Sequence, residues 1–207
     1  MNCLALSDRL PDHCGKGGNH RHPRGISVTQ ATADAVGPGL TIRAGLTGGL
    51  VGAITIWIYE AVVWVGVQHL MPLEGIPRNA TGLVFGKAAQ ESLGWLAYVI
   101  GTGIHFVFAA AWGILFAYVW PYFRRRGYEA TLVALFYAVV AWIVMHGAIM
   151  LASDNHPNYF DPAVIIGGFM SHFFFTVPLA LIVKRLMAPV AAVARLRANP
   201  APAHRGR

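Results

Sequence analysis

The sequence predicts an all-α polytopic membrane protein whose four transmembrane helices form one bundle. Four apolar stretches reach the roughly 20 residues that a helix needs to cross the hydrocarbon core. Only 12% of the 207 residues are charged, against about 25% in an average soluble domain. The stretches lack the alternation typical of half-buried strands, and a helix satisfies its own backbone groups in lipid. We expect one membrane domain, 41–186, with spans at residues 42–68, 93–120, 129–152 and 162–183.

The basic residues indicate how this domain is oriented. Every lysine and arginine except Arg78 and Lys87 lies before or at the very start of the first span, between the second and third spans, or after the fourth. Such enrichment marks the cytoplasmic side of a membrane. The sequence therefore predicts a multi-pass protein of the bacterial inner (cytoplasmic) membrane with both termini in the cytoplasm. The lipid bilayer is the expected partner, and a nucleic acid is not, because the tails offer no folded basic module.

The segments outside the spans are expected to be irregular. Residues 1–40 are rich in glycine, proline and histidine and predict a flexible cytoplasmic tail. This segment lacks the apolar core of a signal peptide, so the first span is expected to act as an uncleaved insertion signal. Residues 187–207 predict a basic cytoplasmic tail, which either lies on the anionic inner leaflet or is solvated.

The first span contains two glycine pairs, each with a spacing of four residues, Gly45/Gly49 and Gly48/Gly52. Small residues at this spacing let helices approach closely in lipid. The general enrichment of glycine in membrane helices explains the pairs equally well.

The connections between the spans contain helix breakers and polar residues. Prolines and glycines predict an external loop at residues 71–92, in which residues 83–90 can form a short interfacial helix. Pro121 is expected to end the second span in a tight turn before an arginine triplet. The second external loop is polar and contains Asp154, His156 and Asp161.

Four ionisable residues within the spans are the main indication of function: Glu60, His105, His146 and His172. Helix rise places His105 and His172 about 15 Å below the outer boundary, and Glu60 and His146 about 9 Å below it. All four are therefore expected in the outer half of the membrane, where inward-facing side chains of a bundle can meet. An ionisable residue in lipid is costly and is taken as functional by default.

Several roles fit this His/Glu site, and the sequence leaves them open. The leading hypothesis is a non-enzymatic site that handles protons or ions, because histidine titrates near neutral pH. A second is a redox subunit or enzyme in which His105, His146 and His172 bind a transition metal, or a facing pair such as His105 and His172 binds haem. A third is a structural membrane protein whose histidines form hydrogen bonds that hold helices together.

The sequence contains no nucleophile elbow, P-loop, dinucleotide fingerprint or HExxH motif. An enzyme is therefore not indicated, although a metal-dependent membrane oxidoreductase stays open. A transport path between only four helices is narrow, which favours a homo-oligomer.

Part of the chain resembles the YagU-like group of small bacterial inner-membrane proteins. The resemblance rests on Gly103-Ile104-His105-Phe106, on Val144-Met145-His146 and on Gly168-Phe169-Met170-Ser171-His172. It covers roughly residues 93–186. It implies a multi-span inner-membrane protein of poorly defined activity that is linked to acid tolerance.

Overall fold

The computed structural model of this chain describes residues 37–154, 158 and 160–198. This part of the chain is helical and contains no strand. The helices are α2 Pro38–Glu60, η1 Ala61–Val67, α3 Gly75–Phe85, α4 Lys87–Ser92, α5 Trp95–Arg125, α6 Ala130–Ala152 and α7 Pro162–Ala198. Four helices are long and apolar enough to cross a membrane, namely α2 continued by η1, α5, α6 and α7. The prediction of an all-α protein with four such helices is confirmed. The tail predicted at residues 1–40 falls almost entirely outside the described residues.

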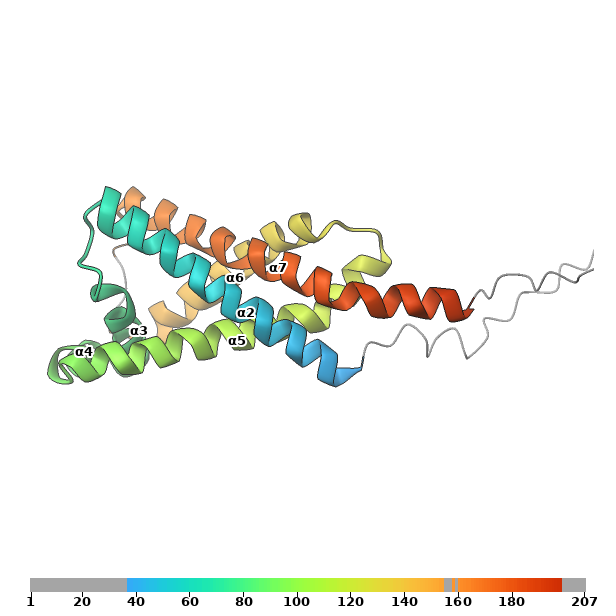
Figure 1. The fold of residues 1–207 in the computed structure, drawn as a ribbon. Helices are drawn as coiled ribbons and strands as arrows, with labels where there is room; N and C mark the ends of the chain where they lie inside the picture. Colours follow the sequence, from blue (N-terminus) through green and yellow to red (C-terminus); the bar gives the residue numbers. More distant parts are fainter. Residues whose placement is uncertain (1–36, 155–157, 159, 199–207) are drawn as a thin grey trace, which may run out of the picture.

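The long helices are arranged around α2, which packs along both α5 and α7 (Figure 1). Helix α6 packs on α7, whereas α5 makes only slight contact with α6 and α7. The start of α2, the end of α7 and the α5–α6 connection lie at one end of the molecule, here called the arginine end after Arg124–Arg126 (Figure 1). Helices α3 and α4 lie at the opposite end, the α3–α4 end.

One glycine pair of α2 faces α5 at van der Waals distance. A Cβ atom added to Gly45 would lie 2.5 Å from the Cα atom of Ile114. A Cβ atom on Gly49 would overlap the carbonyl oxygen of Ala109. Helix α5 contributes Gly113, where an added Cβ atom would overlap the Gly45 carbonyl oxygen. The two backbones therefore touch, and no larger side chain fits between them.

The second glycine pair of α2 faces α7 in the same manner. A Cβ atom on Gly48 would lie 2.7 Å from Leu179 Cδ1, and one on Gly52 would lie 2.7 Å from the carbonyl oxygen of Phe175. Of the two explanations that the sequence left open for these pairs, the structure shows the close approach of helices at both. One pair contacts α5 and the other contacts α7, which explains how α2 packs between these two helices.

Large side chains fill the interior toward the arginine end. The fully or almost fully buried ones there are Phe116, Trp120, Leu179, Val183 and Met187. The Tyr137 hydroxyl of α6 donates a hydrogen bond of 2.8 Å to the Trp112 carbonyl oxygen of α5. This bond joins two long helices that otherwise make little contact.

The predicted external loop at residues 71–92 contains more helix than expected. Helix α3 includes Pro77, which is tolerated because it lies in the first turn, where backbone N–H groups have no intrahelical acceptor. A Cβ atom on Gly101 would overlap the Pro77 carbonyl oxygen, so α3 packs directly on α5. The helix ends at Gly86, whose φ of 86° suits glycine. The short helix predicted over residues 83–90 is thus divided between α3 and α4.

The prediction that Pro121 ends the second span was wrong. Helix α5 continues through Pro121 to Arg125, as membrane helices often do when neighbouring groups satisfy the freed carbonyl. The turn is made instead by Gly127, whose φ of 81° is a left-handed conformation that ends helices. Helix α7 likewise continues past the predicted end of its span, into the segment expected to be a tail.

Candidate functional site

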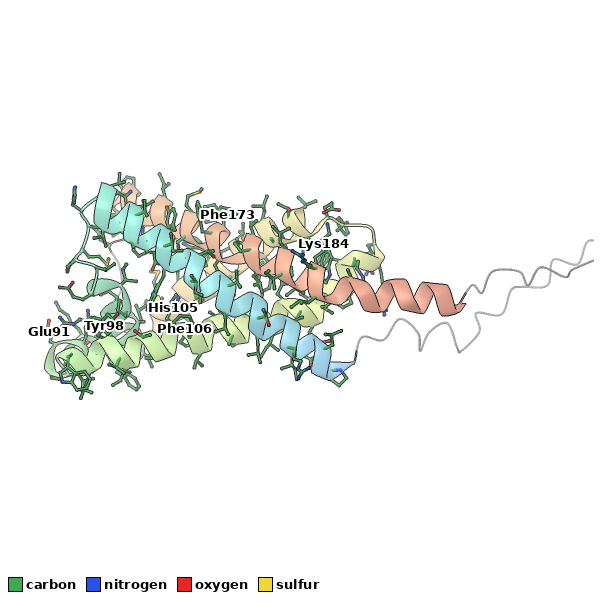
Figure 2. All side chains as sticks on the ribbon, in the orientation of Figure 1. Glu91, Tyr98, His105, Phe106, Phe173 and Lys184 are labelled. Carbon is green, nitrogen blue, oxygen red and sulfur yellow. The ribbon has the colours of Figure 1, made fainter. Side chains whose placement is uncertain are left out.

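A partly open cavity of about 660 Å³ lies between the helices toward the α3–α4 end. Its wall is mostly apolar and comes from α2, η1, α3, α5, α6 and α7. All four ionisable residues of the spans contribute to this wall: Glu60, His105, His146 and His172. Figure 2 shows His105 on α5 where this helix passes α2. The structure thus brings the four predicted site residues to one cavity.

Glu60 is the last residue of α2, at the point where the α-helix widens into the π-helix η1. Short π-helical segments are rare and are frequent at functional sites. The Glu60 side chain is buried, with 8% of its surface exposed. Among the described residues, none donates a hydrogen bond to its carboxyl group. A buried carboxylate without a hydrogen-bond donor is energetically costly. The Glu60 carboxyl group therefore needs either a bound proton or a cation that comes from outside the protein.

His146 of α6 and His172 of α7 face each other, with ring centroids 5.4 Å apart. His146 Nδ1 lies 2.9 Å from the Trp142 carbonyl oxygen, and His172 Nδ1 lies 2.8 Å from the Gly168 carbonyl oxygen. A carbonyl oxygen only accepts, so each neutral ring has its proton on Nδ1 and its lone pair on Nε2. Both of these bonds remain within one helix, so they do not tie helices together.

His105 has a different role from the other two histidines. Its Nε2 atom donates a hydrogen bond of 3.2 Å to the Ala53 carbonyl oxygen of α2. Its ring stacks on Trp57 of α2, with centroids 5.3 Å apart and an interplanar angle of 17°. His105 therefore links α5 to α2 through a hydrogen bond and a ring contact. Its neutral ring has a lone pair on Nδ1.

The three histidines do not form one set of metal ligands. Across the described ranges, no group of three or more His, Cys, Asp or Glu residues lies close enough to hold a metal ion. His146 and His172 meet each other, whereas the Nε2 atom of His105 is bonded to the α2 backbone.

The acidic residues of the predicted second external loop accept hydrogen bonds from backbone N–H groups. Asp154 Oδ1 accepts a hydrogen bond of 2.9 Å from the Lys87 backbone N–H at the start of α4. Asp161 Oδ1 accepts one of 2.9 Å from the Ala163 backbone N–H at the start of α7. Both carboxylates therefore accept hydrogen bonds from backbone N–H groups at helix N-termini, where negative charge is favoured. His156 lies outside the described residues.

The aromatic part of the wall was not predicted from the sequence. Trp64 of η1 and Trp112 of α5 line the cavity. The Trp64 indole nitrogen is buried and has no hydrogen-bond partner among the described residues. A signal existed for Trp64, because it follows Glu60 by four positions. That spacing places an aromatic ring one helical turn from the ionisable group.

No family model, curated protein or solved structure matches this chain. The resemblance of residues 93–186 to the YagU-like group therefore stays a prediction. What the chain does has to follow from the chemistry of the cavity.

Proposed function

We propose that this chain is an integral inner-membrane protein whose helices form a bundle around a site that takes up and releases protons, and so handles protons or ions within the membrane. The observation that supports this most directly is Glu60, a buried carboxyl group without a donor among the described residues, in the wall of an apolar cavity. His105 and His172 add ring nitrogens that can accept a proton. Ionisable groups placed in this way are typical of proton and ion pathways in membrane proteins.

We further propose that the arginine end faces the cytoplasm and that the cavity lies in the outer half of the membrane. The arginine end has the basic residues Arg43, Arg124, Arg125, Arg126, Lys184 and Arg185, whereas the α3–α4 end has Arg78 and Lys87. This asymmetry follows the positive-inside rule and supports termini on the cytoplasmic side.

Proton flux into liposomes tests the function. Purified full-length protein is reconstituted around a pH-sensitive dye, a pH gradient is imposed, and potassium with valinomycin fixes the membrane potential. We expect flux above that of empty liposomes, and Glu60→Gln should remove it because the amide cannot take up a proton. The matched control is Glu91→Gln, which changes an acid that is exposed and ion-paired with Lys87. Unchanged flux in a folded Glu60→Gln variant would disprove the proposal.

Labelling of single cysteines tests the orientation. Cys3 and Cys14 are first replaced by serine, and Arg125→Cys and Lys87→Cys are introduced separately. A membrane-impermeant maleimide added outside intact spheroplasts should label the cysteine at position 87 and spare the one at position 125. The opposite pattern would reverse the proposed orientation.

A structural role is supported for one histidine. The bond from His105 to the Ala53 carbonyl oxygen joins two helices, as a packing histidine would. The hydrogen bonds of His172 stay within α7, so a hydrogen bond between helices does not account for its position in the cavity wall.

A further inference from the structure

The electrostatic character of the cavity indicates which ligands it can accept. Among the described residues that line the cavity, Glu60 is the only acid and there is no lysine or arginine. While the histidines of the wall are neutral, a bound anion would therefore meet no counter-charge, whereas a cation would meet the buried carboxyl group of Glu60. The wall of the cavity therefore favours a ligand with positive charge.

The polar atoms of the wall add to this preference. His105 and His172 each use one ring nitrogen to donate to a backbone carbonyl, which leaves the other nitrogen as an acceptor. Ser171 directs its hydroxyl proton to the Gly168 carbonyl oxygen at 2.8 Å. These groups offer lone pairs, which suit a ligand that has positive charge or N–H donors.

The rest of the wall is unsuited to a small inorganic cation. Such an ion needs several oxygen or nitrogen ligands at once, and the described residues contain no group of three ionisable ligands. The cavity instead contains aromatic rings, among them Trp64, Phe108, Trp112 and Phe175. Aromatic faces attract organic cations, and apolar walls bind their hydrocarbon parts.

We propose that the cavity binds an apolar organic monocation, such as a quaternary phosphonium or ammonium ion with hydrocarbon substituents, in exchange for one proton on Glu60. The exchange balances charge, because one proton leaves the carboxyl group for each cation that pairs with it. The volume of about 660 Å³ lies within the range of small-molecule pockets, about 300–1,000 Å³. This inference rests on the proposed function, since it requires that Glu60 takes up and releases a proton.

Two ions of nearly the same shape and opposite charge test the proposal, tetraphenylphosphonium and tetraphenylborate. Binding of each to detergent-purified full-length protein is measured by equilibrium dialysis, with proton release followed by a dye in weakly buffered solution. We expect tetraphenylphosphonium to bind with release of one proton, and tetraphenylborate not to bind above the detergent background. In Glu60→Gln the affinity should fall about thirtyfold or more, because a buried charge pair is lost. Glu91→Gln should bind like the wild type.

The outcomes separate this inference from the proposed function. Equal binding of both ions, or full affinity in Glu60→Gln, would overturn the inference and indicate apolar partitioning. Glu60-dependent proton flux without phosphonium binding would overturn the inference while supporting the proposed function. Phosphonium binding in a protein that shows no proton flux or release would overturn both the exchange and the proposed function.

Discussion

The half of the molecule toward the arginine end and the half toward the α3–α4 end are built from the same long helices, yet only one of them is closely packed. In the first half Phe116 of α5 is fully buried, as are Leu179 and Met187 of α7. In the second half Phe108 of α5 has 45% of its surface exposed and lies at the cavity.

The distribution of glycine along α2 accounts for the difference. Four of its five glycines, Gly45, Gly48, Gly49 and Gly52, lie where the backbone touches α5 and α7. The following segment contains larger side chains, and one of them, Trp64, lines the cavity together with Glu60. Small residues thus bring backbones together along the first part of the helix, whereas the segment after them contributes side chains to the cavity wall.

Substitution of a contact glycine should have the largest effect on this arrangement. Gly49→Leu would place a side chain where the Ala109 carbonyl oxygen lies, and we expect a loss of about 3 kcal/mol or more in unfolding free energy. Gly103→Leu on α5 is the control, because a Cβ atom there meets nothing within 4 Å. Thermal melting in detergent distinguishes the two, and similar melting temperatures would refute the role assigned to Gly49.

Truncation of phenylalanines on α5 compares the two halves directly. Phe116→Ala should cost about 3 kcal/mol because it leaves a void in the packed half. Phe108→Ala should cost less than about 1 kcal/mol because its side chain is half exposed beside a cavity. Denaturant titration of both variants measures the difference. Equal costs would mean that the cavity half is packed as tightly as the other.

The histidines provide a comparison within the cavity half. His105→Phe keeps an aromatic ring beside Trp57 but loses the bond to the Ala53 carbonyl oxygen, and should cost about 1 kcal/mol. His172→Phe breaks no hydrogen bond between helices and should change stability less while it alters proton flux. If both variants melted alike and kept their flux, the distinction between the histidines would fail.

The smallest effect is expected at the arginine end, where Lys184 Nζ lies 2.9 Å from Glu129 Oε2 (Figure 2 shows Lys184 on α7). The hydrogen bond and the positive charge of Lys184 lower the pKa of Glu129, as does the Ala130 backbone N–H. The folded pKa is therefore below the unfolded one. The stabilisation is fully present above the ordinary glutamate pKa of 4.5 and is lost as the pH falls through the lowered pKa.

A pH series of melting temperatures measures this effect. Lys184→Met should bring the Glu129 pKa back toward its ordinary value and flatten the acid dependence of melting slightly, since the pair is solvent-exposed. Lys87→Met is the control, because it breaks the exposed pair with Glu91 at the other end. An identical acid profile in wild type and Lys184→Met would show that the pair does not contribute.

Hydropathy and helix rise were sufficient to predict four helices long and apolar enough to cross a membrane, and to group the four site residues that line one cavity. The length of an apolar stretch specifies the helix, and the position of Glu60 or His172 along its helix follows from counting residues. The rule that proline interrupts a helix failed at two positions. Pro77 and Pro121 are tolerated inside helices because of their position in the first turn or their packing in the membrane domain.

The partner of each histidine could not be predicted. His105 bonds to α2 and His172 to its own helix, and this difference depends on the rotation of each helix about its axis. Nothing in the spacing of residues fixes that rotation when all faces of a helix are apolar. The π-helix after Glu60 escaped prediction for a similar reason, since one widened turn leaves no periodic signal.

The two glycine faces of α2 also imply an order in which the helices pack during synthesis of the chain. Ribosomes add residues from the N-terminus, so α2 is finished before α5, and α5 before α7. Gly45 and Gly49 receive their partner when α5 emerges, but Gly48 and Gly52 wait for α7. Between these two events one face of α2 has its partner and the other does not. Synthesis of α7, and not insertion of α2, is therefore the step that completes the packing of α2.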